Sequence, residues 1–222
     1  MNQFWKAVRP DGTDFYTGMV QWAPPEDHEG EWIVRHPTAT EIGVYASEYL
    51  SVATVPTDCI NMSWPCRLLM VEAVGDIAAP SRALPNKRAG IAFRVTGERP
   101  AHEALGPQGE YVAALIDRAS RLTVEELDGL DAAWCAARYA TMDAARDVAR
   151  SAARDAARSA ARYAAGYAAW DAAGGTAGGT AEDAAMGLVM RDLISTDHYD
   201  TLTKPWASVI GPIHPDDEPL KP

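Results

Sequence analysis

The stretch DAARDVARSAARDAARSAARYAAGYAAWDAA, residues 143–173, decides the fold of this chain. It belongs to a series of four-residue words that runs from Asp131 to Met186, and most of these words contain two adjacent alanines. Alanine is the strongest helix former, because its side chain loses no conformational entropy in a helix. The stretch therefore predicts helix as far as about Ala173, either as one long helix or as a helical hairpin.

The repeat length of four differs from the 3.6 residues of a helical turn, so each position moves about 40° around the helix with every repeat. Alanine and arginine are thus spread around the helix and form no single apolar stripe. Larger side chains recur at i, i+4 and i+7 in two places only. They predict two faces for a protein partner or for self-association: Cys135, Tyr139 and Met142 at one end, and Tyr163, Tyr167 and Trp170 at the other.

The arginines of the repeat leave three interpretations open. The repeat is a tolerated expansion without a specific role, a spacer or helical pairing surface, or a strip that binds phosphate. The arginines that would form such a strip are Arg146, Arg150, Arg154, Arg158 and Arg162. A straight helix over residues 124–173 would be about 75 Å long at 1.5 Å per residue. Such a helix projects from the body, folds into a hairpin or pairs with another copy.

Local signals set the ends of the helical region, residues 123–195. Thr123 and Glu126 have the spacing of a capping box, in which each side chain serves a free backbone N–H of the first turn. The sequence GGTAGG predicts a break near residues 174–180, after which Thr180 and Asp183 would cap a second helix. The Pro-rich residues 196–222 predict an extended tail, which Trp206, Val209 and Ile210 would dock onto the body.

Residues 1–122 predict a globular sheet domain, and the chain as a whole an α+β protein with a small mixed or antiparallel sheet. A turn at Pro10–Gly12 would join residues 4–9 and 14–22 in a hairpin. Residues 66–77 are a continuous apolar run typical of a central strand. Further strands are predicted at residues 31–36, 48–56 and 89–98. Apolar residues at helical spacing within 110–122 predict a helix that covers one face of the sheet.

The amino-acid composition limits the functions and the cellular location that we expect for this chain. The net charge of −11 argues against general binding to nucleic acids or anionic membranes. Three cysteines without a CxxC pair fit a reducing cytoplasm. The first residues lack the features of a signal peptide, and no apolar run approaches the 18 to 20 or so residues of a membrane span. We therefore expect a cytoplasmic protein.

Motifs for common chemistry are missing from the sequence. It contains no GxxxxGK[ST], HExxH or GxSxG, and its five histidines are scattered. We therefore predict no metal and no cofactor. One weak constellation, Arg9, Ser47 (or Ser51) and Glu72, resembles the Arg–Ser–Glu order of ADP-ribosyltransferase folds. That resemblance implies that Arg9 would hold a phosphate of NAD and that Glu72 would orient a ribose hydroxyl.

Three segments together resemble uncharacterised alanine-rich proteins of actinobacterial phages and prophages. They are PCRLLMVE at residues 65–72, the repeat that starts LDAAWCAARYA at residue 130, and RDLISTDHYDTLTKPWASVIGP at residues 191–212. The resemblance implies an accessory protein of a phage or mobile element, in the host cytoplasm or in the virion. It transfers no catalytic residues. Three functions stay open: a non-enzymatic protein that binds a host or phage protein, an ADP-ribosyltransferase-like enzyme that uses NAD, and a structural or assembly component of the phage.

Overall fold

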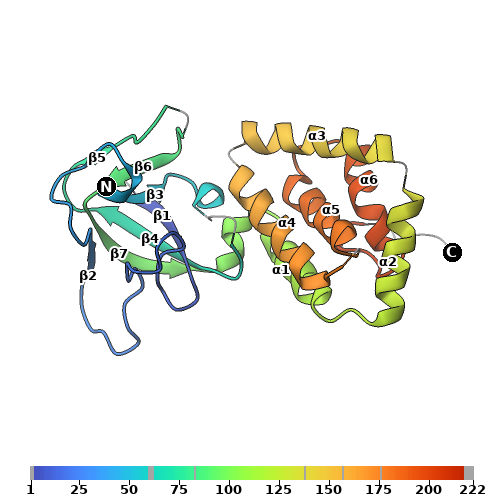
Figure 1. The fold of residues 1–222 in the computed structure, drawn as a ribbon, viewed down its shortest axis with the longest axis horizontal. Helices are drawn as coiled ribbons and strands as arrows, with labels where there is room; N and C mark the ends of the chain where they lie inside the picture. Colours follow the sequence, from blue (N-terminus) through green and yellow to red (C-terminus); the bar gives the residue numbers. More distant parts are fainter. Residues whose placement is uncertain are drawn as a thin grey trace. The chain divides into compact units, whose positions relative to one another are not determined.

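A computed structural model describes residues 3–59, 63–82, 84–137, 139–156, 158–175 and 177–217. The chain forms two compact units, Met1–Ala104 and Leu105–Pro222. The first unit is built on a β-sheet and the second consists of helices (Figure 1), which confirms the α+β class predicted from the sequence.

The described strands of the first unit form a seven-stranded sheet in the order β2-β7-β4-β1-β3-β6-β5. Every neighbouring pair is antiparallel. The strands are β1 (Gln3–Val8), β2 (Trp32–Arg35), β3 (Leu50–Ala53), β4 (Arg67–Ala73), β5 (Ile77–Ala78), β6 (Lys87–Gly90) and β7 (Ala92–Arg99). Short 3-10 segments connect them at η1 (Ala46–Glu48), η2 (Pro56–Asp58) and η3 (Ala101–Leu105).

The predicted central strand is confirmed as β4, which pairs with β1 on one side and with β7 on the other. Its adjacent residues Leu68 and Leu69 are both fully buried. Because successive side chains of a strand point to opposite faces, both faces of the sheet are covered at this point. This burial on both faces explains why the strand sequence is continuously apolar and does not alternate between apolar and polar residues.

The predicted hairpin between residues 4–9 and 14–22 is wrong. The turn forms, with Gly12 at a φ of 85° and its N–H donating to the Arg9 carbonyl at 2.9 Å. Beyond it, however, Asp14 accepts hydrogen bonds from Thr17 N, Thr17 Oγ1 and Val20 N. These bonds fold the segment into a loop, which leaves a single bridge between Thr13 and Gln21 where a second strand was expected.

This loop also supplies part of the core of the sheet unit. Trp22 is 1% exposed and its ring centroid lies 5.9 Å from that of Phe93 on β7. The helix that was predicted to cover the sheet, α1 (Gly109–Ala119), belongs instead to the second unit, where it packs against α4 and α5. The boundary expected at residue 122 accordingly lies after Ala104. Helical spacing correctly predicted the buried residues Val112, Leu115 and Ile116 but could not tell which element buries them.

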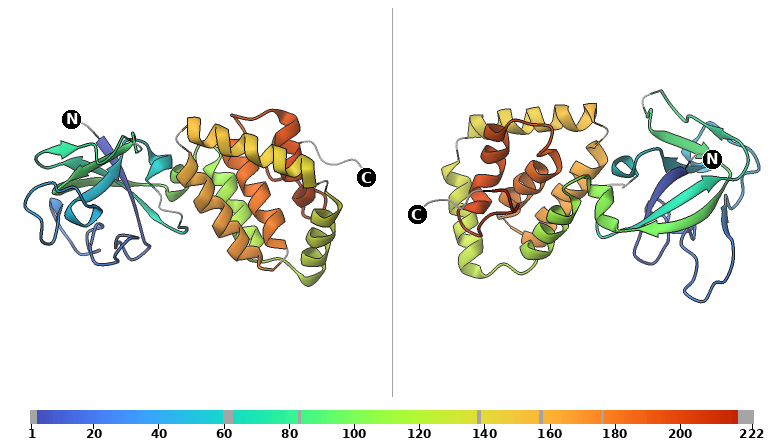
Figure 2. Two further views of the ribbon diagram at one scale, coloured as in Figure 1. Left: turned by 45° about the horizontal axis from the view of Figure 1, so that its top comes forward. Right: turned by 180° about the vertical axis from the view of Figure 1, so that it is seen from behind.

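The second unit holds six described helices, with α5 at the centre of the packing (Figures 1 and 2). All residues of α5 except Glu182 are buried, and α5 contacts each of the other five. Besides α1, the helices are α2 (Val124–Ala136), α3 (Tyr139–Asp155), α4 (Ser159–Ala173), α5 (Ala177–Met190) and α6 (Thr196–Ala207). A helix that is surrounded on all sides is expected to be apolar or small all round, and α5 meets this expectation except at Thr180, Glu182 and Asp183.

The capping box at the start of α2 is confirmed, with both of its hydrogen bonds present between Thr123 and Glu126. One continuous helix to Ala173 is wrong, because the chain turns after α2 and again after α3. The second turn lets Arg158 donate to the carboxylate of Asp192 (2.9 Å) and to the Val189 carbonyl (3.2 Å). Most helical stability in proteins comes from packing. Three shorter helices packed around α5 are therefore more stable than one long exposed helix.

The break predicted near residues 174–180 is correct at its start and wrong at its end. Gly174 and Gly175 have φ of 69° and 50° and terminate α4. Gly178 and Gly179, in contrast, lie inside α5, where a Cβ would come within 2.9 Å of Trp170 Cδ2 and 3.0 Å of Trp134 Nε1. These two glycines therefore make room for indole rings. Thr180 is no cap, since its hydroxyl donates to the Leu130 carbonyl at 3.3 Å.

The predicted extended tail is wrong for residues 196–207, which form α6. Ser195 caps this helix by accepting a hydrogen bond from His198 N. Trp206 docks as expected and is 1% exposed. Pro205 misled the prediction, because proline is normally tolerated only in the first turn of a helix, whereas Pro205 lies inside α6 close to its C-terminal end. Within the described part of the chain, each helix is too short or too polar to span a bilayer.

Candidate interaction surface

Helix α4 presents one of the two predicted contact faces intact. Its alanines Ala161, Ala164, Ala165 and Ala169 are fully buried. On the outer side, Tyr163, Tyr167 and Trp170 are 41%, 52% and 43% exposed, and we name these three residues the aromatic strip. The rings of Tyr163 and Tyr167 stack, with centroids 6.3 Å apart and an angle of 20° between their planes. The strip is therefore a defined surface whose rings are held in place.

Packing beneath the strip fixes its position on the helical unit. The indole of Trp170 lies against Gly178 of α5, where a side chain would collide with it. Gly166 of α4 similarly faces Glu182 of α5, with 3.2 Å from a Cβ built there to Glu182 Cγ. Small residues on both helices thus let α4 and α5 approach closely, while the aromatic rings stay at the surface.

Arg162 adds a cation beside the strip. Its Cζ lies 3.9 Å from the centroid of the Tyr163 ring, and the residue is only 8% exposed. Its Nε is buried without a hydrogen-bond partner among the described residues. A buried N–H without a hydrogen-bond partner is unfavourable, because its lost hydration is not replaced. Glu182 of α5 is an electrostatic neighbour, because the charge of Arg162 counteracts the rise that burial causes in the pKa of Glu182.

The other arginines of the repeat mostly have internal partners. Arg146 of α3 binds Asp183 of α5 through two bonds, Nε to Oδ1 at 2.7 Å and Nη2 to Oδ2 at 2.6 Å. Arg150 pairs with Asp147 at 2.8 Å. Together with the Arg158–Asp192 pair, these contacts use cationic groups that a phosphate-binding strip would need. The interpretation of the repeat as such a strip loses its support.

The second predicted face, formed by Cys135, Tyr139 and Met142, does not exist as one surface. Cys135 is exposed near the end of α2, whereas Met142 is 4% exposed in α3. The turn between the two helices breaks the helical spacing on which the prediction depended. The Tyr139 side chain lies outside the described residues. Met142 instead lines an apolar groove of about 510 Å³ together with Ala133, Ala136, Lys204 and Pro205.

The structure does not bring Arg9, Ser47 and Glu72 together. Glu72 on β4 pairs in register with Gln3, six residues before Arg9, which places the two about 20 Å apart along the strand. Ser47 lies exposed in η1, and not on a strand. Arg9 donates to the Phe15 carbonyl at 3.3 Å, and Glu72 is 3.7 Å from Arg94. The order of these residues along the sequence suggested an NAD site, but the strand register places Arg9 and Glu72 far apart.

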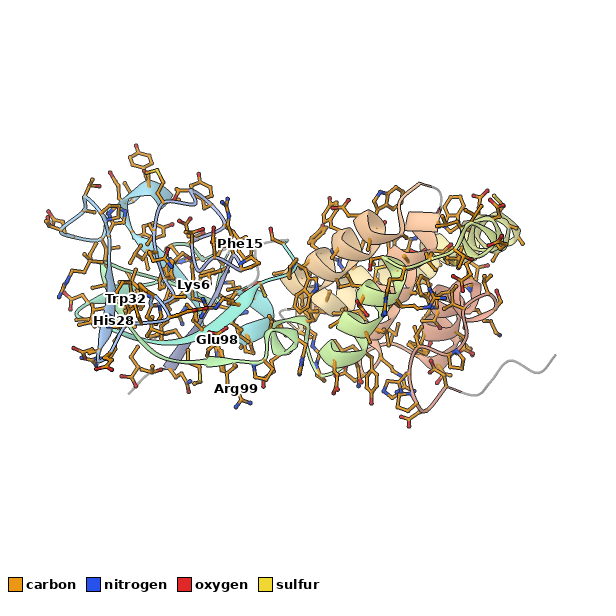
Figure 3. All side chains as sticks on the ribbon, turned by 90° about the horizontal axis from the view of Figure 1, so that it is seen from below. Lys6, Phe15, His28, Trp32, Glu98 and Arg99 are labelled. Atoms are coloured by element: carbon orange, nitrogen blue, oxygen red, sulfur yellow. The ribbon has the colours of Figure 1, made fainter. Side chains whose placement is uncertain are left out.

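Sequence reasoning missed a lysine on the core face of the sheet unit. Lys6 on β1 is labelled in Figure 3. The buried residues Phe4 and Val8 lie on the same face of the strand, because strand residues alternate. The Nζ of Lys6 donates to the Ser51 carbonyl at 3.2 Å and lies 4.7 Å from the centroid of the Trp22 ring. Burial lowers the pKa of Lys6 to about 8. Both contacts are internal, and the alternation in FWKAVR was the signal that could have found it.

The three thiols differ strongly in accessibility, which yields a first prediction. Burial raises the pKa of Cys59 and of Cys66 to about 12, while Cys135 is exposed. Since the thiolate is the reactive form, we expect the native protein to react rapidly with Ellman's reagent at one thiol, and at all three only after denaturation. The Cys135→Ser variant should lose the fast reaction entirely. Fast labelling of a second thiol in that variant would contradict the structure.

Metal binding and known relatives give no further guide to the site. Among the described residues, no group of three or more His, Cys, Asp or Glu side chains is arranged to hold a metal ion. No protein-family model, curated protein or solved structure matches the chain.

Proposed function

We propose that the protein is a non-enzymatic interaction protein whose helical unit binds a protein partner through the aromatic strip of α4. The observation that carries the proposal is an exposed surface of two tyrosines and a tryptophan on α4, with Arg162 against the Tyr163 ring. Tyrosine, tryptophan and arginine are the residues most enriched among those that dominate binding energy in protein interfaces. The resemblance of three segments to phage proteins adds the proposal that the partner is a host or phage protein, or the chain itself. A role in phage assembly stays a prediction, which analysis of purified virions for this chain would decide.

A photo-crosslinker tests the proposal at residue resolution. Benzoylphenylalanine in place of Tyr167, in the full chain, should give a covalent adduct with one defined polypeptide on irradiation of expressing cells. The same group in place of Val124, which is 68% exposed on α2, is the matched control and should give no such adduct. Absence of an adduct at position 167, or equal adducts at both positions, would overturn the proposal.

A further inference from the structure

We propose that residues 212–217 are a pH-sensitive strap, which lies on the helical unit while His214 is neutral and detaches when this histidine is protonated. The strap follows the turn after α6 and ends the described part of the chain. It contains no helix or strand, and His214 is its one buried residue, at 8% exposed. The inference goes beyond the proposed function, because it concerns a part of the helical unit other than the aromatic strip.

Side chains, and not the backbone, hold the strap on the helices. Among the described residues, its one backbone–backbone hydrogen bond lies within the strap, where Asp217 N donates to the His214 carbonyl at 3.0 Å. The hydroxyl of Tyr199 on α6 donates to Asp217 Oδ2 at 3.0 Å. The ring of Tyr111 on α1 packs against that of His214, with 4.4 Å between the ring centroids. The attachment of the strap therefore depends on the charge and protonation of a few side chains.

The hydrogen bonds of the His214 ring fit its neutral form. The backbone N–H of Asp216 donates to Nδ1 at 3.1 Å, so Nδ1 carries no proton. Nε2 then carries the proton and lies 3.1 Å from Oε1 of Gln108, an acceptor at the start of α1. Arg191 follows α5 and can only donate, and its Nη1 lies 2.6 Å from Nδ1 and 3.0 Å from Nε2. A second proton on the ring would therefore point at a donor and bring two cations into contact.

The charged groups of this cluster act on His214 in opposite directions. The charged or titratable side chains that belong to the cluster are Arg191, Asp216, Asp217, Tyr111 and Tyr199. Asp216 Oδ2 is 3.5 Å from Nδ1 and would stabilise a protonated ring, as would the carboxylate of Asp217. Both carboxylates, however, also pair with Arg191, at 3.2 and 3.5 Å. Burial, followed by the charge of Arg191, outweighs them and lowers the pKa of His214.

The sign of the pH dependence follows from this lowered pKa. On the detached strap, His214 would have the ordinary pKa of a histidine, about 6.5. The attached state thus binds the proton less tightly than the detached state does. A fall in pH through the ordinary value therefore favours detachment, and a rise in pH favours attachment. Detachment would expose the Tyr111 ring and the guanidinium of Arg191 on the helical unit.

Nuclear magnetic resonance of the full chain tests the strap. The backbone order parameters S² of residues 213–217 should be about 0.85 at about pH 7.5 and fall below about 0.6 at about pH 5.5. This range lies well above the ordinary pKa of an aspartate carboxyl group, about 3.9. The His214 ring should carry its proton on Nε2 at the higher pH and titrate with a midpoint below about 6.5.

Two variants separate His214 from a general effect of acid. His214→Gln should give the same order parameters at both pH values, because glutamine does not titrate. His28→Gln is the matched control, since it makes the same substitution at an exposed histidine of the sheet unit and should keep the wild-type response. The proposal would be overturned by wild-type order parameters that do not change with pH, by a His214 midpoint above about 6.5, or by an undiminished response in His214→Gln.

Discussion

Replacement of Asp183 by alanine is expected to lower the free energy of unfolding by about 3–5 kcal/mol, the effect of leaving a buried charge without its partner. The Asp183 side chain is 2% exposed and that of Arg146 is 20% exposed. Two hydrogen bonds join them, and the Trp134 side chain is a further hydrogen-bond donor to the carboxylate. Chemical denaturation followed by circular dichroism would measure the loss.

A matched control separates burial from charge in this experiment. The Asp147–Arg150 pair has the same chemistry, but its side chains are 75% and 48% exposed. Asp147→Ala should therefore change the free energy of unfolding by less than about 1 kcal/mol. The double variant Asp183→Leu with Arg146→Met removes both charges and should recover most of the loss. A small effect of Asp183→Ala, similar to that of Asp147→Ala, would contradict the buried pair.

The pH dependence of this pair follows from the direction of the pKa shift. Burial raises the pKa of Asp183 in spite of the neighbouring Arg146. The folded state then binds the proton more tightly than the unfolded state does. The contribution of Asp183 to stability is therefore larger below its unfolded pKa and decreases as the pH rises through the folded pKa. Wild-type protein should lose stability relative to Asp183→Asn over this rise in pH.

The sequence predicted the secondary structure better than it predicted which elements pack against each other. The strand at residues 66–77, the helix at 110–122 and the capping box at Thr123 depend on local chemistry, and all three are present. The loop after Gly12 and helix α6 were missed, because Asp14 and the Ser195 cap stabilise conformations that hydrophobic pattern does not encode. Local sequence signals thus predict secondary structure reliably where no side chain forms hydrogen bonds that redirect the backbone.

The site was predictable only where it lies within one helix. Tyr163, Tyr167 and Trp170 stay together because their spacing matches α4 along its whole length. Cys135 and Met142 have the same spacing, but a turn lies between them. No glycine or proline in the sequence marks this turn. Arg162 was not singled out, since it follows two alanines just as Arg154 and Arg158 do. Only the structure shows that Arg162 is buried against the Tyr163 ring.

Gly187→Ala is expected to destabilise the protein by about 1–3 kcal/mol, even though alanine favours a helix over glycine by up to about 1 kcal/mol. A Cβ at position 187 would lie 2.8 Å from Thr203 Cγ2 and 3.3 Å from Leu202 Cβ, both on α6. Thr203 cannot rotate freely, because it is 4% exposed and its hydroxyl donates to the Tyr199 carbonyl at 2.9 Å. The added methyl group must therefore shift α6 against α5.

Gly166→Ala is the matched comparison, since this glycine also lies buried in a helix and also faces a neighbouring helix, in this case α5. Its nearest neighbour is Glu182 Cγ at 3.2 Å, which belongs to an exposed and flexible side chain that can move aside. We expect this variant to be as stable as the wild type, or more stable by up to about 1 kcal/mol, through helix propensity. Urea denaturation of both variants measures the difference. Equal shifts in the same direction would show that propensity, and not the contact between α5 and α6, determines the effect at position 187.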